Sequence, residues 1–136
     1  VSLFADGSAE SKYTVSVPGG TKDSSGQYTT TYDIPEVAPG TYTMRVSKKN
    51  HVTREYTVTV SGDVKTQDVK IHLMGDINGD GRIGIGDINK ANLHAKGKKI
   101  LLGYELACAD INGDGRVTIS DVNRLSLHNK GKSLLW

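Results

Sequence analysis

Hydrophobic and polar residues alternate with a period of two over the first 73 residues, and their spacing becomes helical after that. In the first part, Val, Thr and Tyr recur at every second position in short runs that are separated by Gly, Pro, Asn or Asp. Such alternation is typical of half-buried strands, and the separating residues favour turns. We therefore predict strands in five runs: KYTVSV (12–17), QYTTTYDI (27–34), TYTMRVS (41–47), REYTVTV (54–60) and VKIHL (69–73).

Short strands with turns about ten residues apart predict a small all-β, Ig-like sandwich. Tyr28 and Tyr42 take strand positions that are typical of a sandwich core. Asp33 and Glu36 are close in sequence, but they flank Pro35, where a strand ends in a turn. No pattern of catalytic side chains occurs in this part, so we expect a structural role for it.

The composition changes near Met74, where threonine becomes rare and hydrophobic residues recur at helical intervals. We place a domain boundary here and predict a multi-domain chain, with an all-β domain at 1–73 and an all-α domain at 74–136. Cys108 lies on a predicted short helix, ILLGYELACAD (100–110), and we interpret it as a buried structural thiol rather than a catalytic one. A single cysteine excludes an internal disulfide framework.

The second part repeats itself after 34 residues: DINGDGRIGIGD begins at Asp76 and DINGDGRVTISD begins at Asp110. Residues 76–98 and 110–132 share 15 identities in 23 positions, and the likeness extends into LHxKGK beyond the loops. In each of these twelve-residue segments, oxygen-bearing side chains occupy positions one, three, five and twelve, and glycine occupies position six. This is the ligand spacing of an EF-hand calcium loop.

Each loop is predicted to hold one calcium ion, because three carboxylates within twelve residues repel one another until a hard cation binds. The seventh position would contribute a backbone carbonyl, and a water would fill the ninth. An Asp/Asn/Gly-rich turn that binds nothing is the alternative, which two matching loops disfavour. The predicted ligands are Asp76, Asn78, Asp80, Arg82 (backbone), Gly84 (through water) and Asp87, then Asp110, Asn112, Asp114, Arg116 (backbone), Thr118 and Asp121.

Both loops depart from an ordinary EF-hand, since position twelve is Asp instead of Glu and no helical pattern precedes the first loop. Each unit is therefore predicted to be a loop followed by one helix. With Ile88 facing the core, steps of 100° place Leu93 about 140° away from it, and Leu127 takes the same place in the second unit. We expect these leucines to contact a partner, the alternative being contact with the middle helix or the sandwich.

Other features narrow the classes of partner. The formal net charge of +2 is small and its cations are scattered, which argues against nucleic acid. No apolar run reaches membrane-spanning length, so we expect no direct membrane insertion. His94 and His128 are predicted to be surface or rim residues, and a zinc site shared by them is disfavoured because no third ligand recurs beside them. The chain begins at Val1 without an initiator Met, which indicates a fragment or a processed chain.

The last residues, SLLW, lie beyond the repeat, because we expect the repeated pattern to matter only as far as Gly131. We predict that this tail packs back near Met74 and Gly75 or on the sandwich. The alternative is that Trp136 is an exposed anchor for the partner.

The duplicated loop–helix units, with Asp at position twelve and the short middle helix, resemble the dockerin family over residues 75–132. Residues 24–60, SSGQYTTTYDIPEVAPGTYTMRVSKKNHVTREYTVTV, are similar to carboxypeptidase-regulatory-like sandwiches and to the X module beside scaffoldin dockerins of the type II kind. The resemblance implies an X module followed by an all-α dockerin with duplicated F-hand motifs and two calcium ions. It also implies a cohesin as partner.

In dockerins, loop positions ten and eleven and the outer helix face carry the cohesin contacts. Many dockerins have Ser-Thr at these positions, whereas this chain has Ile-Gly and Ile-Ser, which indicates a more apolar interface. Ile85 and Ile119 could instead pack inward. By this resemblance the contact residues are Ile85, Gly86, Asn89, Leu93 and Lys96, then Ile119, Ser120, Asn123, Leu127 and Lys130.

The resemblance thus implies a non-enzymatic, secreted docking protein attached to a bacterial cell-surface complex for polysaccharide degradation. Its calcium-dependent partner would be the cohesin of a scaffoldin or of a cell-surface anchoring protein, in a cellulosome-type assembly. The alternative is an extracellular adhesin or carbohydrate-binding fragment in which calcium is purely structural.

Overall fold

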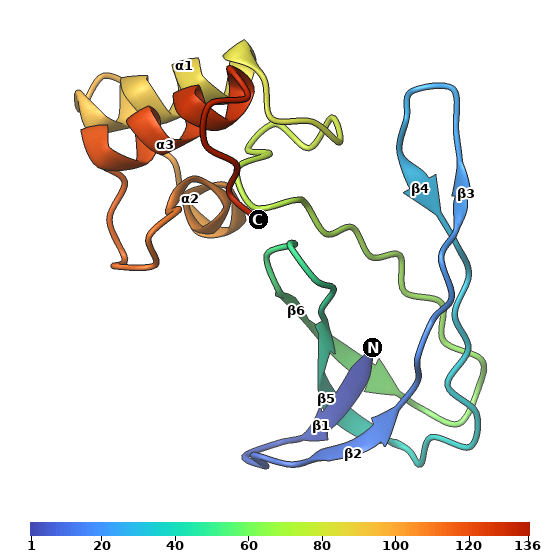
Figure 1. Ribbon diagram of the computed structural model, residues 1–136. Coiled ribbons are helices and arrows are strands. Elements are labelled where there is room, and N and C mark those ends of the chain that lie inside the picture. Colours follow the sequence, from blue (N-terminus) through green and yellow to red (C-terminus); the bar gives the residue numbers. More distant parts are fainter. The chain divides into compact units, whose positions relative to one another are not determined.

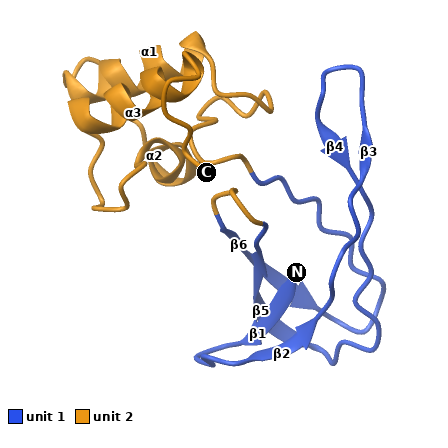
Figure 2. Ribbon diagram, in the orientation of Figure 1, with its two compact units in different colours: residues 1–48, 53–71 blue, residues 49–52, 72–136 orange.

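Six strands precede three helices in the computed structural model, which describes residues 1–136 (Figure 1). The chain forms two compact units: unit 1 comprises residues 1–48 and 53–71, and unit 2 comprises residues 49–52 and 72–136 (Figure 2). The strands are β1 (Ser2–Ala5), β2 (Ser11–Thr14), β3 (Thr21–Lys22), β4 (Tyr28–Thr29), β5 (Gly40–Val46) and β6 (Arg54–Val60). The helices are α1 (Ile85–Ala95), α2 (Gly103–Ala109) and α3 (Ile119–Asn129).

Unit 1 is built on one antiparallel sheet with the strand order β2-β1-β5-β6. The hairpin of β5 and β6 stays in register from Gly40 opposite Val60 to Val46 opposite Arg54. Successive side chains of a strand point to opposite faces, so the period-two pattern buries one face only. The buried side chains of this face are Leu3, Tyr42, Met44, Val46 and Val58.

Two irregular segments complete the core of unit 1 where strands were predicted. In 27–34 only β4 forms, and 69–73 forms no strand, although Tyr32, Ile34, Val69 and Ile71 still pack on the sheet core. Side chains replace the missing backbone ladder: Tyr32 donates a hydrogen bond to the carbonyl of Gln67, and the N–H of Lys70 donates to the hydroxyl of Tyr56 at 3.0 Å. The alternating pattern therefore predicts which residues are buried but not how the backbone pairs.

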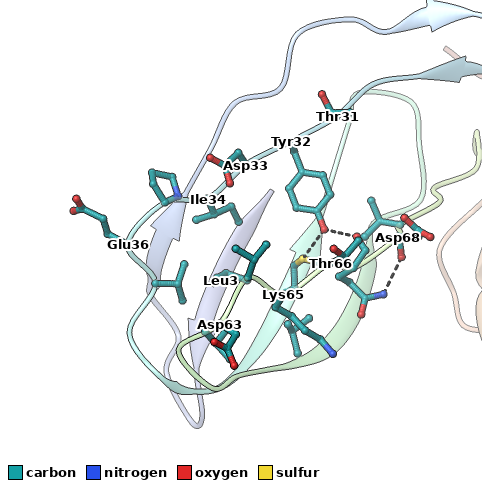
Figure 3. Close-up of a pocket in the computed structure, with 18 of the residues that line it drawn as sticks. Leu3, Thr31, Tyr32, Asp33, Ile34, Glu36, Asp63, Lys65, Thr66 and Asp68 are labelled. Atoms are coloured by element: carbon teal, nitrogen blue, oxygen red, sulfur yellow. Dashed lines mark hydrogen bonds between the residues drawn. The ribbon is translucent and has the colours of Figure 1, made fainter.

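A cavity of about 760 Å³ lies among these segments in unit 1 (Figure 3). Hydrophobic side chains such as Leu3, Met44 and Val58 line it together with the acidic residues Asp33, Glu36, Asp63 and Asp68.

The predicted fold class, an Ig-like or carboxypeptidase-regulatory-like sandwich followed by an all-α dockerin, is wrong. The structure contains a single four-stranded antiparallel sheet and a separate two-stranded ribbon of β3 and β4, in a small chain of equally modest helix and strand content. Threonine-rich runs fit a half-buried pleated surface without specifying a partner strand. Tyr28, predicted to be a core residue, is 64% exposed on the ribbon, whereas Tyr42 is buried as expected. The boundary at residues 73–75 stays a prediction.

Unit 2 has its own core, in which α1 packs against α3. Cys108 is fully buried there, in agreement with its interpretation as a structural thiol. The middle helix forms as α2, and no helix precedes the first loop. None of the three helices combines the length and hydrophobicity that crossing a membrane requires. The core residues are Ile77, Ala91, Leu101, Cys108, Ala109, Ile111, Val117, Val122 and Leu125.

A short non-helical element leads into the first loop of unit 2. His51 and Leu73 form an isolated antiparallel bridge, and the N–H of Met74 donates to the carbonyl of Asn50 at 2.9 Å. Tyr104 on α2 holds both sides of this element: its hydroxyl donates to the carbonyl of Val52 at 2.6 Å and accepts from the N–H of His72 at 2.9 Å. The start of the first loop is therefore fixed by backbone pairing rather than by an entering helix.

Candidate metal centre

The first loop and the first turn of α1 bring three carboxylates together. Asp76, Asp80 and Asp87 each offer an oxygen, and these oxygens all lie within 4.8 Å of one another. Asp76 is 2% exposed and Asp87 is fully buried, whereas Asp80 faces solvent. Oxygen donors at this spacing suit a hard divalent cation such as calcium, so the residues present fit the predicted ion.

The backbone of the loop wraps around Asp76. Its Oδ1 accepts hydrogen bonds from the N–H groups of Gly79 at 2.8 Å and Asp80 at 3.1 Å, and its Oδ2 accepts from Gly81 at 2.9 Å. The chain can turn this tightly because both glycines have positive φ, 73° at Gly79 and 88° at Gly81. The DxxGxG part of the motif is therefore required by the turn itself.

Asp87 joins the beginning of the loop to the beginning of α1. Its Oδ1 accepts from the N–H groups of Ile77 at 2.8 Å and Asn78 at 3.0 Å, while its Oδ2 accepts from Gly84, the N-cap residue, at 2.9 Å. A carboxylate in the first turn of a helix also interacts favourably with the helix dipole. The side chain at position twelve is thus fixed from both sides before any ion is considered.

The second loop repeats these hydrogen bonds 34 residues later. Asp110 accepts from Gly113, Asp114 and Gly115, and Asp121 accepts from Ile111, Asn112 and Thr118. Two bonds are new where the first loop has Gly84: the hydroxyl of Thr118 donates to Asp121 at 3.1 Å and accepts from the N–H of Ser120 at 3.2 Å. Both loops therefore have the same internal scaffold.

The electrostatics of the two loops differ. Burial raises the pKa of Asp76 above its ordinary value; hydrogen bonds from Gly81 and Gly79 oppose this, and the neighbouring charge of Asp87 adds to it. Burial also acts to raise the pKa of Asp121, but hydrogen bonds from Thr118, Asn112 and Ile111 outweigh it, so that pKa is lowered. A cation placed beside Asp76 would favour its charged form and so oppose the effect of burial.

The repeated LHxKGK motif proves to be a helix terminus, which the sequence analysis did not explain. After α1, the N–H of Leu101 donates to Nδ1 of His94 at 2.8 Å; after α3, the N–H of Leu135 donates to Nδ1 of His128 at 3.1 Å. Gly97 and Gly131 reverse the chain with φ of 65° and 64°. Each histidine thus fastens the segment that follows its helix.

The repeat therefore extends past Gly131, contrary to expectation, because Leu135 takes the place of Leu101. Leu101 is buried in the core of unit 2, and Leu135 packs against the same core. Trp136 lies beside His128, with ring centroids 5.0 Å apart, and remains 44% exposed. The equivalence went unnoticed because KILLG and SLLW share few identical residues.

The structure leaves all ten predicted partner-contact residues exposed to solvent. Ile85 and Ile119 at the helix starts are 63% and 59% exposed, so they do not pack inward. Leu93 and Leu127 are 37% and 40% exposed. The contacts themselves, and the ligand roles of Arg82, Gly84, Arg116 and Thr118, stay predictions.

Comparison with known families adds one finding to this geometry. Residues 74–128 match the family model of the dockerin type I domain. This match supports a dockerin in less than half of the chain, and it does not confirm the type II-like assignment or the X module. No curated protein and no solved structure matches the chain.

Dockerin domains are non-catalytic modules that bind calcium and dock onto cohesin modules in cellulosome-like complexes, and proteins that carry them are typically extracellular. The acidic cluster of Asp76, Asp80 and Asp87 is in keeping with a calcium-binding domain.

The hydrogen bond from the N–H of Leu101 to Nδ1 of His94 predicts a specific effect on stability. We expect His94→Ala to lower the free energy of unfolding by about 1 to 2 kcal/mol, because the N–H of Leu101 loses its acceptor. His94→Asn should recover part of this loss, since its amide oxygen can replace Nδ1. Urea unfolding in calcium, followed by circular dichroism, measures both variants. An unchanged midpoint for His94→Ala would contradict the role assigned to the ring.

Proposed function

We propose that this chain is a non-enzymatic docking module whose C-terminal part binds two calcium ions and presents two related helix faces to a cohesin. The proposal is carried by one observation: two loops with the same hydrogen-bond scaffold precede two helices whose outer faces carry the same exposed apolar residues. The family match over residues 74–128 supports the class of partner.

In this proposal each loop holds one ion through its side chains at positions one, three, five and twelve. Bound calcium would offset two of the three negative charges that the carboxylates of a loop carry. The protein's own contribution is the scaffold, because Asp87 and Asp121 already tie each loop to the first turn of its helix. A calcium-loaded loop therefore fixes the direction in which Ile85 and Leu93, or Ile119 and Leu127, face the partner.

The natural setting that we propose is a secreted protein of a bacterial cell-surface complex that degrades polysaccharides. The partner would be the cohesin of a scaffoldin or of a cell-surface anchoring protein. Unit 1 would then serve as a structural neighbour of the docking module.

A second candidate is an extracellular adhesin or carbohydrate-binding fragment in which calcium is structural. The observation that favours it is the exposed ring of Tyr28 on the β3–β4 ribbon, with the ammonium groups of Lys22 and Lys48 each 5.9 Å from its centroid. Exposed aromatic rings are suited to stacking on sugars. The repeated exposed apolar residues of unit 2 argue against this second candidate, because a glycan site on unit 1 would give them no role.

Capture experiments separate the two candidates. Immobilised cohesin modules of type I and of type II are tested in parallel, and we expect cohesin to retain the chain. A chelator should abolish this retention, because the loops lose their ions. Immobilised cellulose and xylan should not retain it. Retention on glycan together with indifference to every cohesin would favour the second candidate.

The internal repeat predicts how α1 and α3 each contribute to cohesin binding. If either face can dock alone, in orientations related by a half-turn, Leu93→Ala and Leu127→Ala should each leave cohesin affinity within about threefold, while the double variant weakens it by about a hundredfold or more. Calorimetric titration with the cohesin measures this. Complete loss of binding in either single variant would exclude interchangeable orientations and indicate that both helices bind at once.

A further inference from the structure

The exposed hydrophobic residues of this chain are themselves repeated. Eight of its ten exposed large hydrophobic side chains lie in unit 2, and they form four pairs with the spacing of the repeat. A single exposed leucine is ordinary, but four pairs retained in a small unit indicate a surface that is covered in use. The pairs are Ile85 with Ile119, Leu93 with Leu127, Ile100 with Leu134, and Leu102 with Trp136.

Two of these pairs lie outside the helix faces, in the segments that follow α1 and α3. Their exposure is imposed by the fold. Leu101 is buried in the core and its N–H is held by His94, so its neighbours Ile100 and Leu102 are directed to solvent. Leu135 is held in the same way by His128. These apolar side chains are therefore fixed in place rather than carried on a loose chain end.

Positive charge accompanies the apolar residues. Residues 85–102 and 119–136 contain seven Lys and Arg, and their only acidic residues, Asp87 and Asp121, are fully buried. Unit 2 as a whole has ten Lys and Arg against seven Asp and Glu, a formal net charge of +3. The cations recur like the apolar residues, as Lys96 with Lys130 and Lys98 with Lys132, whereas Lys90, the counterpart of Arg124, forms a salt bridge with Glu105 at 2.6 Å.

We propose that the docking surface extends from the two helix faces onto residues 98–102 and 132–136, and that the matching surface of the partner is an apolar patch bordered by carboxylates. This inference rests on the proposed function, since it describes the cohesin that this chain would select. Apolar side chains supply affinity when they are desolvated, and complementary charges raise the association rate and reject partners of the wrong sign. A polyanion such as nucleic acid would use the cations but leave four apolar pairs without a role.

The charge part is tested with Lys98→Glu/Lys132→Glu, a repeat-related pair outside the ten contacts predicted from the sequence. The matched control is Lys22→Glu/Lys65→Glu, which makes the same change of net charge on unit 1. Association with a cohesin that binds the parent chain is measured in about 50 mM and about 500 mM NaCl. We expect the unit 2 variant to associate about tenfold more slowly at low salt and to lose most of its salt dependence, whereas the control changes by less than about twofold.

The apolar part is tested with Ile100→Ala/Leu134→Ala, against Val64→Ala at an exposed site on unit 1 as control. All three replaced side chains are at the surface, and calcium-loaded circular dichroism checks that each variant folds. We expect the double variant to dissociate about tenfold faster and the control to match the parent.

The outcomes separate the proposals. Absence of binding to every cohesin would remove the proposed function itself. Parental binding by both double variants would leave docking intact and overturn the extension of the surface. An effect of the charge variant alone would overturn the apolar patch, since the segments would then contribute to cohesin binding only through their charge.

Discussion

The hydrogen bonds of two buried aspartates connect the two loops of unit 2 to the starts of α1 and α3. Asp87 and Asp121 are fully buried, and each accepts backbone N–H groups from the start of its loop and from the start of its helix. A buried carboxylate is expensive unless hydrogen bonds and a counter-charge satisfy it. In the first loop Asp87 lies beside the buried Asp76, whose pKa is raised, so a cation would offset two neighbouring charges; in the second loop hydrogen bonds already lower the pKa of Asp121.

This constraint connects the chemistry of the loops to the surface of the module. The helix starts are anchored by the aspartates, the helix ends are anchored by the histidines, and the apolar residues between and beyond them point outward as a result. Calcium in the loops would thus stabilise a surface that lies mostly outside the loops themselves. Such coupling of metal binding to folding is expected where ligands and contact residues share one short element.

The part of this structure that could be predicted from the sequence is the part set by local geometry. The spacing of Asp, Asn and Gly placed the loops, the helical period placed Leu93 and Leu127 outward, and the position of Cys108 on a helix indicated a buried thiol. The sandwich prediction failed because the partner of a strand lies elsewhere in the chain. The alternation of hydrophobic and polar residues indicates which side chains are buried, but not which strands pair. Tyr32 and Ile34 are buried on the expected side with no ladder beside them. The role of His94 was missed for a related reason, since its acceptor atom is satisfied by a backbone group seven residues ahead.

The most direct test of the account is a calcium titration of the parent chain beside Asp80→Ala and Asp114→Ala, by calorimetry after complete removal of divalent ions. Both replaced side chains are exposed, so their loss should spare the hydrogen bonds of the buried aspartates. The account predicts two ions for the parent chain and one strong site for each variant, together with a gain in helical circular dichroism as the loops fill. Absence of binding heat in the parent chain, with helical content unchanged by calcium, would contradict it.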